Sequence, residues 1–206
     1  MHPETLNKET SIILNLLKDS VSDFYLAGGT ALALLLGHRI SVDLDFFSIN
    51  EFSTQEIIDR LKTKGHLEVT SRDKDTLNGS LDGVKISFFK YPYKLLFPIK
   101  EYNNVMLADE KDIAAMKILA ISDRGSKKDF IDLFILLKTY SFNEILEYFN
   151  EKYKDYNYNK LHILKSLVYF SDADLDPEPT YINPIDWEKV KKFIKNIVDE
   201  YIKNKS

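Results

Sequence analysis

The sequence predicts an α/β (α+β) protein with a mixed first part and an all-helical second part. Up to about residue 100, segments with the periodicities of strands and of amphipathic helices alternate. Asp82-Gly83, between two apolar strand candidates, is a signal for a β-hairpin. After Tyr91-Pro92-Tyr93, the long segments have only the helical period. The change of pattern predicts two different kinds of structure along the chain.

The first part is expected to alternate between helix and strand. Its elements are a helix at 5–19, a strand at 24–27, a helix at 31–36 closed by Gly37, a strand at 41–47, a helix from Ser53 to about Lys64, and strands at 67–71, 76–81 and 84–89. The second part is expected to contain helices at 109–121, 127–137, 143–153, 160–169 and 186–202, with a loop at 171–184.

We therefore expect two domains, an α/β domain at residues 1–108 and a helical domain at 109–206. The seam falls near residues 100–108. Because ligands commonly bind between two such parts, we expect the helical domain to complete a cleft.

Composition narrows the class of protein. The chain has 206 residues and no cysteine, which excludes disulfides, thiolate zinc sites and cysteine nucleophiles. The first residues resemble no signal peptide, and the apolar runs are too short to span a bilayer, so we expect a cytoplasmic protein. The net charge of −4 argues against a broad nucleic-acid-binding surface but leaves room for a local basic groove.

Asp43 and Asp45 are the sharpest local feature of the sequence. Side chains alternate along a strand, so both carboxylates should point to the same face. A divalent cation relieves the repulsion between them, and magnesium favours a few carboxylates together with substrate phosphates. The alternative is an exposed strand face that happens to carry two acids.

Gly28-Gly29-Thr30 opens a helix directly after a strand. Backbone N–H groups at a helix N-terminus bind phosphate, and glycine allows the phosphate to approach closely. The alternative is a tight turn that needs glycine torsions. The succession of strand, glycine pair, helix and Asp-x-Asp favours a phosphate site beside a metal pair.

Two segments at these positions resemble a known family. Residues 26–34 (Leu-Ala-Gly-Gly-Thr-Ala-Leu-Ala-Leu) and 38–47 (His-Arg-Ile-Ser-Val-Asp-Leu-Asp-Phe-Phe) look like the AbiEii/AbiGii-type toxins. These belong to the DNA polymerase β-like nucleotidyltransferase superfamily. Thirteen residues separate Gly29 from Asp43, which fits the superfamily pattern. The resemblance implies a polymerase β-like core with a mixed sheet.

The resemblance extends over roughly residues 24–138. Residues 83–89 with 91–93, and residues 112–117, 124–125 and 128–133, resemble later motifs of the family. One departure concerns the third acid that many superfamily members carry on a later strand. That position falls within residues 84–89, where this chain has Ser87, while Asp82 lies in the turn.

Lys117 is the only charged residue within the apolar segment 113–121, so it must reach solvent or meet an anion. It could bind nucleotide phosphate or stabilise charge in the transition state; the alternative is a lysine at the helix rim. Asp132 lies within another apolar segment, and Asp129 is on the same helical face. The two acids could pair with Lys128 or Arg124. The family resemblance favours an active-site pair facing Lys117, in which Asp132 orients the lysine or acts as general base.

Arg39 precedes the Asp-x-Asp segment and could either contact phosphates or hold the loop in place. The final helix interleaves apolar residues with lysines at helical spacing. This pattern is more typical of a packed helix with a solvated face than of an RNA-binding helix, which remains the alternative.

The expected function is nucleotidyl transfer from a nucleoside triphosphate with Mg²⁺ or Mn²⁺. The expected metal ligands are Asp43 and Asp45; the expected catalytic residues are Asp43, Asp45, Lys117 and Asp132; and the expected nucleotide-binding residues are Gly28, Gly29, Thr30, Arg39, Lys117 and Asp129. Resemblance implies a toxin of a toxin–antitoxin or abortive-infection system, with tRNA or a protein side chain as acceptor and a cognate antitoxin as partner. The alternatives are a nucleotide- or partner-binding module without turnover, and a small-molecule nucleotidyltransferase.

Overall fold

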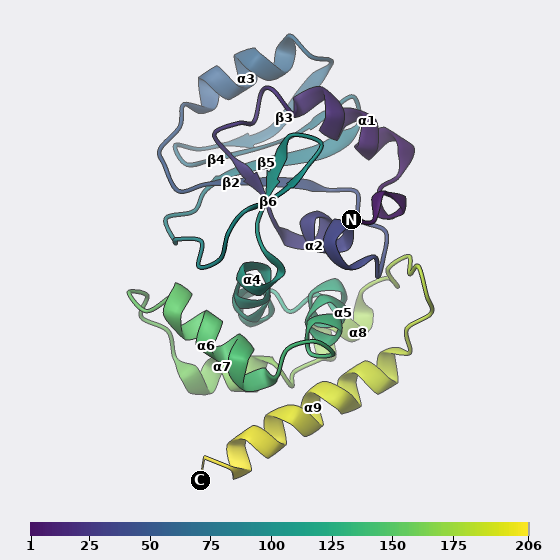
Figure 1. Ribbon diagram of the computed structural model, residues 1–206, viewed down its shortest axis with the longest axis vertical. Coiled ribbons are helices and arrows are strands. Elements are labelled where there is room, and N and C mark those ends of the chain that lie inside the picture. The colour runs from purple at the N-terminus through teal and green to yellow at the C-terminus, as the bar shows by residue number, and fades with distance from the viewer. Residues whose placement is uncertain (206) are drawn as a thin grey trace. The chain divides into compact units, whose positions relative to one another are not determined.

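Within residues 1–205, which the computed structural model describes, seven β-strands form one mixed sheet (Figure 1). The sheet belongs to the first of two compact units, Met1–Asp109, and the second unit begins at Glu110. The strands are β1 (Tyr25–Leu26), β2 (Leu44–Ser48), β3 (Leu67–Arg72), β4 (Thr76–Leu81), β5 (Val84–Lys90), β6 (Lys100–Tyr102) and β7 (Val105–Leu107). Among the residues described, none of the helices combines the length and the apolar composition that a membrane span requires.

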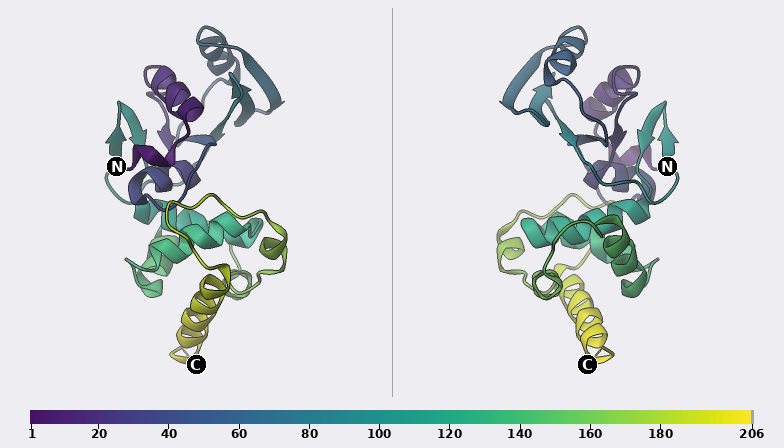
Figure 2. Two further views of the ribbon diagram at one scale, coloured as in Figure 1. Left: turned by 90° about the vertical axis from the view of Figure 1, so that its right-hand side faces the viewer. Right: turned by 90° about the vertical axis from the view of Figure 1, so that its left-hand side faces the viewer.

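The strand order is β3-β4-β5-β2-β1-β7-β6. Strands β2 and β5 are parallel, as are β1 and β7, and the other neighbours are antiparallel. Figure 2 shows the β3–β4 and β6–β7 hairpins at opposite ends of the sheet. The predicted mixed sheet is therefore confirmed.

The two faces of the central strands differ in polarity. On one face, Phe46 of β2 stacks on Phe88 of β5 with ring centroids 5.2 Å apart, and both side chains are buried. Helices α1 (Lys8–Leu17) and α3 (Thr54–Lys62) pack against the strands β5, β4 and β3. On the other face, Asp45 of β2, Ser87 of β5 and Asn78 of β4 are aligned in register. The apolar face builds the core, which leaves polar groups on the opposite face.

Helices α1 and α2 begin at different residues from those predicted, whereas α3 starts after Ser53, which caps it as predicted. A short 3-10 turn, Pro3–Thr5, precedes α1, which starts later because Asn7 caps it by accepting a hydrogen bond from the Thr10 amide at 2.7 Å. Helix α2 (Gly28–Leu36) begins earlier than predicted, so the glycine pair forms its first turn. Gly37 ends α2 in the left-handed conformation with φ 67°, as the sequence indicated.

The segment near residues 100–108, where the sequence predicts the seam, contains the β6–β7 hairpin, and the first unit ends just after it at Asp109. Asn103 and Asn104 form a two-residue turn with φ of 49° and 64°, a conformation that asparagine tolerates. The hairpin joins the sheet because Leu107 of β7 pairs with Leu26 of β1. The segment is thus part of the first unit and lies beside the strand that leads into α2.

The second unit is helical. Its elements are α4 (Glu110–Asp123), α5 (Lys127–Leu136), α6 (Phe142–Lys152), α7 (Lys160–Ser166), α8 (Ser171–Leu175) and α9 (Trp187–Lys203). Helix α4 packs against α5, α6 and α7, and α9 packs against α5 and α6. The predicted loop at 171–184 was wrong at its start, because α8 forms there and Trp187 packs edge-on against Phe170 at 5.9 Å. A fully buried ion pair of 2.7 Å joins Lys152 to Asp112 and fastens α6 to α4.

Candidate functional site

The turn from β1 into α2 is shaped by side chains that approach its glycines. Gly28 has φ +68°, and a Cβ atom placed there would lie 3.4 Å from Oδ2 of Asp45. A Cβ atom on Gly29 would clash with the guanidinium of Arg39, which is itself buried. The structure therefore brings the Asp45 carboxylate into ordinary contact distance of Gly28, whose positive φ favours glycine, and places the Arg39 guanidinium where a side chain at position 29 would displace it.

Thr30 fixes the segment that leads into β2. Its hydroxyl forms a 2.8 Å hydrogen bond with the Ser41 hydroxyl and donates to the backbone carbonyl of Asp43. Thr30 and Ser41 are buried. The side chain that the sequence assigned to nucleotide binding thus holds the first turn of α2 against the residues before β2. Ser41, which the sequence analysis did not single out, belongs to the same contact.

Asp43 lies just before β2, and Asp45 lies within it. Both are half-buried, while Leu44 between them is fully buried, so the predicted alternation of the side chains is present. Ser87 of β5 is the register partner of Asp45. Asp82 is not beside them in the register, and its carboxylate accepts a 2.8 Å hydrogen bond from the His66 amide at the hairpin turn.

The oxygen ligands offered by Asp43, Asp45 and Ser87 suit magnesium better than a metal that takes all of its ligands from the protein. Among the described residues 1–205 there is no group of three or more His, Cys, Asp or Glu side chains placed to hold an ion. Magnesium is typically held by one or two carboxylates, with waters and substrate phosphates as the remaining ligands. Asp43 and Asp45, with the Ser87 hydroxyl beside Asp45, fit that requirement.

In the second unit, α4 and α5 bring together Lys117, Asp129 and Asp132. The Lys117 ammonium lies 2.8 Å from Oδ1 of Asp129 and 2.6 Å from Oδ2 of Asp132. The lysine side chain is 4% exposed and the two aspartate side chains are fully buried. Buried charges need such partners, because an unpaired one would carry a large desolvation cost.

Arg124 and Ser126 complete the surroundings of Asp129. The arginine donates from Nε at 2.8 Å and from Nη2 at 3.1 Å, and the serine hydroxyl donates at 2.7 Å. Burial by itself would raise the pKa of Asp129, but the charges and hydrogen bonds of Lys117 and Arg124 outweigh it and hold that pKa well below its usual range. Asp129 is therefore a fixed negative charge at neutral pH.

Ser126 was missed in the sequence although a signal was present. Its position three residues before Asp129 is the spacing of a helix N-cap and its acidic partner. Ser126 is the N-cap residue of α5, and its hydroxyl donates to the Asp129 side chain. This contact ties the start of α5 to the cluster around Lys117.

Comparison with known proteins assigns the chain to a family. A family model described as the nucleotidyl transferase AbiEii toxin of type IV toxin–antitoxin systems matches residues 16–85 and 77–201. The uncharacterized protein aq_aa25 of Aquifex aeolicus (strain VF5) is 44% identical over 194 residues, which cover 89% of this chain and 90% of that protein.

Solved structures share the fold at low sequence identity. MenT4, a nucleotidyltransferase toxin of Mycobacterium tuberculosis H37Rv, matches with a TM-score of 0.60 and 13% identity, over 93% of this chain and 83% of that one. JHP933 from Helicobacter pylori matches with a TM-score of 0.57 and 18% identity, over 97% and 96% of the two chains. The fold is therefore that of nucleotidyltransferases, and the family match establishes that this chain belongs to the AbiEii nucleotidyl transferase toxin family.

Proposed function

We propose that the protein transfers a nucleotide from a magnesium- or manganese-bound nucleoside triphosphate to a hydroxyl of an RNA or a protein. In this proposal it acts in the cytoplasm as the toxin of a toxin–antitoxin or abortive-infection system and has a cognate antitoxin. The observation that carries the proposal is the pair Asp43 and Asp45, with the Asp45 carboxylate packed against Gly28 at the start of α2. Membership of a nucleotidyl transferase family supports it.

Asp43 and Asp45 would hold the divalent cation, with Ser87 beside Asp45. When bound, such an ion stabilises negative charge on the attacking and leaving oxygens of the phosphoryl group. The backbone N–H groups of Gly28 and Gly29 would receive phosphate oxygens at the N-terminus of α2.

Thr30 and Arg39 would act by keeping this site in shape. Thr30 fixes the Asp43 backbone through its carbonyl, and so sets where the carboxylate stands. Arg39 donates to the Ile40 carbonyl at 3.1 Å and fills the space above Gly29. A cationic guanidinium there also favours an incoming phosphate.

Lys117 would stabilise charge on the phosphates, and Asp129 and Asp132 would control its position. The 2.6 Å contact between Lys117 and Asp132 supports an orienting role for this acid over that of a general base. Asp129, shared between Lys117 and Arg124, would keep both cations in place. The two carboxylates also balance the two positive charges.

A binding module without turnover is the second candidate, and Ser87 favours it. The register partner of Asp45 is a neutral hydroxyl at the place where many related enzymes carry a third acid. Under this alternative the protein binds triphosphate with a divalent cation but forms no product. Substitution of Ser87 by Asp would then create activity that the natural protein lacks.

The test is transfer of label from each of the four ribonucleoside triphosphates, labelled at the α-phosphate, in a cell lysate supplemented with magnesium. Separate analysis of RNA and protein identifies the acceptor class. The proposal predicts label in one of the two fractions, and its loss on chelation. Triphosphate binding without any labelled product would support the binding module instead.

A further inference from the structure

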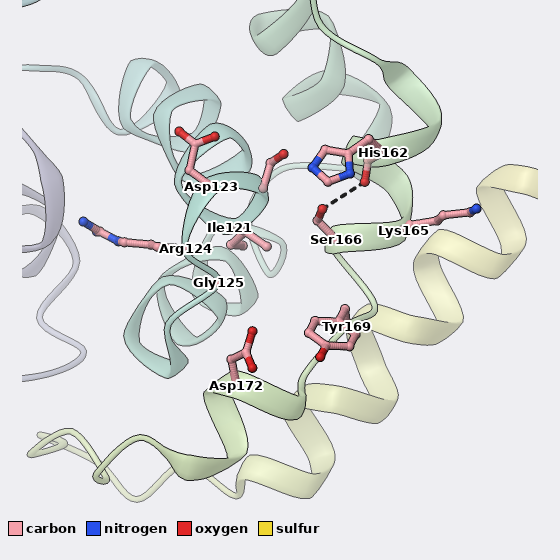
Figure 3. A pocket seen from close by; sticks show the side chains of 10 residues that line it. Ile121, Asp123, Arg124, Gly125, His162, Lys165, Ser166, Tyr169 and Asp172 are labelled. Atoms are coloured by element: carbon pink, nitrogen blue, oxygen red, sulfur yellow. Dashed lines mark hydrogen bonds between the residues drawn. The ribbon is translucent and has the colours of Figure 1, made fainter.

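The helical unit contains a pocket of about 350 Å³ that the proposed transfer residues do not occupy (Figure 3). The end of α4 forms one wall through Ile121 to Gly125, and the opposite wall comes from α7, Tyr169 and the start of α8. The volume is in the lower part of the range found for small-molecule sites. It therefore suits a ligand the size of a base or a nucleoside.

Polar and aromatic side chains converge on this pocket. Figure 3 shows His162, Ser166, Tyr169 and Asp172 directed toward the space between the two walls. The Ser166 hydroxyl donates to the His162 carbonyl at 2.9 Å. In the part of the chain that the structure describes, no hydrogen bond or ion pair engages the His162 imidazole, the Tyr169 hydroxyl or the Asp172 carboxylate. These three groups are available to a ligand.

The cations at the pocket are directed elsewhere. Lys165 extends away from the space, and so does Arg124, whose guanidinium is bound to Asp129. A phosphate would therefore find no directed lysine or arginine inside the pocket, and would meet the Asp172 carboxylate instead. A neutral planar ring fits this lining better, because Tyr169 is an exposed residue (57%) whose aromatic side chain can stack on such a ring.

Asp172 restricts which ring is suitable. An ionised carboxylate only accepts hydrogen bonds, so its partner must present N–H groups. Cytosine, adenine and guanine carry an exocyclic amino group, which a carboxylate recognises well. Uracil carries carbonyl oxygens on both sides of its single N–H group, and these repel a carboxylate. The pocket chemistry therefore favours amino-bearing bases.

One residue connects the pocket with the Lys117 cluster. Arg124 lines the pocket wall, its guanidinium holds Asp129, and Asp129 holds Lys117. A ligand in the pocket would thus contact the same turn of α4 that positions a proposed transfer residue. Because Arg124 and Asp129 connect the pocket with Lys117, we take a nucleotide of the proposed transfer reaction as the ligand that the pocket would bind.

We propose that this pocket binds the base of a nucleotide that takes part in the transfer, with Tyr169 stacking on it and Asp172 selecting an amino-bearing base over uracil. The inference rests on the proposed nucleotidyl transfer and adds base selection to it. The base belongs either to the triphosphate or to the end of an acceptor RNA.

Calorimetry with the full chain and magnesium distinguishes these two sources. One arm titrates the four ribonucleoside triphosphates, and the other titrates single-stranded RNA trimers of C, A or U. In the titration whose ligand places its base in the pocket, Tyr169→Ala should weaken binding about tenfold, because stacking of a base on an aromatic ring contributes about that factor to the affinity. Tyr169→Phe keeps the ring and should bind nearly as the natural protein does. Asp172→Asn should reduce the preference over uracil.

Two control substitutions lie outside the pocket in the same unit. Tyr156 is exposed to a similar extent as Tyr169, at 48%, and Asp199 is an exposed acid of α9. Tyr156→Ala and Asp199→Asn should leave binding unchanged. If Tyr169→Ala and Asp172→Asn leave both arms as unaffected as these controls, the proposal is overturned.

Free nucleosides separate this proposal from the proposed function. Cytidine and uridine carry no phosphate, so they test the pocket without the metal site. Cytidine should shift the NMR signals of the His162 ring, identified with His162→Gln, and uridine should shift them less. A response to cytidine without any transfer activity would reject only the proposed function. No response to either nucleoside and no binding in either arm would reject the base pocket.

Discussion

Lys117 shows how a single residue connects stability with the proposed chemistry. Its ammonium is buried between Asp129 and Asp132, and both of these are fully buried. A buried ion pair adds little net stability compared with apolar residues, but removal of one partner leaves an uncompensated charge. Lys117 and the two acids therefore stabilise one another, and Asp129 has Arg124 as a second cationic partner.

Lys117→Met should destabilise the protein by about 3–5 kcal/mol, because Asp129 and Asp132 would remain buried with one cation fewer. Urea denaturation at pH 7 measures this loss. The matched control is Lys195→Met at an exposed position of α9, which should change the free energy of unfolding very little. Equal effects of the two substitutions would contradict the burial and pairing of Lys117.

Arg124 should control how stability depends on pH. The pKa of Asp129 is lowered in the folded protein, so its contribution to stability is present above the pKa of the unfolded chain, near 4, and is lost as the pH falls. Arg124→Gln removes a cation and two hydrogen bonds from Asp129. The variant should be less stable than the natural protein at pH 7, and the difference should shrink below about pH 4, as Asp129 becomes protonated first in the folded variant and only at lower pH in the natural protein.

Urea denaturation of both proteins at pH 7 and at lower pH measures the effect. A difference in stability that stays constant from pH 7 to pH 2.5 would show that Arg124 does not act through the ionised Asp129.

The sequence indicated some of these residues but not their contacts. The glycine pair and the alternation of Asp43 and Asp45 follow from local rules, so both could be predicted. The partners of Thr30 could not, because its contact with Ser41 and the Asp43 carbonyl depends on how α2 meets the segment before β2. The sequence also left several partners open for Asp129, and the structure gives it Arg124 together with Lys117.

At the scale of elements, helix α5 is held at its N-terminus by the segment that follows α8. The Asp176 carboxylate accepts a hydrogen bond from the Lys127 amide at 2.8 Å, and the Lys127 ammonium donates to the Asp176 carbonyl at 2.8 Å and to Glu178 at 2.9 Å. Helix α5 carries both Asp129 and Asp132, so these contacts of Lys127 with Asp176 and Glu178 hold in place the helix that supplies the acidic partners of Lys117.

Asp176→Ala should lower the free energy of unfolding by about 1 kcal/mol, the usual effect of losing a side-chain cap. Asp176→Asn retains an oxygen acceptor and should lose less. Thermal or urea denaturation measures both, with Asp199→Ala as a control at an exposed acid of α9. If Asp176→Ala is as stable as that control, the Asp176 side chain has no role in holding α5.

The long elements were predictable from the sequence, whereas the β6–β7 hairpin and helix α8 were not. Long amphipathic helices such as α6 and α9 have a clear period, and Ser141 forms the capping box that starts α6. The β6–β7 hairpin consists of two strands of three residues each, which is too short for a period to be visible. The Asn103-Asn104 turn was its only local signal. Helix α8 was missed because its five residues are also too few to show a period.

At the scale of the whole molecule, the order of an α/β part and a helical part agrees with the family match across almost the entire chain. Local patterns predicted the fold class because hydrophobic periodicity changes after the last long strand. That residues 109–206 complete the nucleotide cleft stays a prediction of the sequence. The toxin role is a property of the family. The labelling experiment in a cell lysate would identify which molecule accepts the nucleotide in the proposed transfer.

The most direct test of nucleotidyl transfer compares four proteins in one assay: the natural chain, Asp43→Asn, Asp45→Asn and Asp19→Asn. Asp19 is an exposed acid of the same unit and serves as the control. The measured quantity is the initial rate of label transfer from α-labelled triphosphate with saturating magnesium. We predict that either carboxylate substitution lowers the rate at least a hundredfold while Asp19→Asn retains it, since a change of that size corresponds to about 2.7 kcal/mol of lost transition-state stabilisation. Transfer at the natural rate by both Asp43→Asn and Asp45→Asn would contradict the proposal.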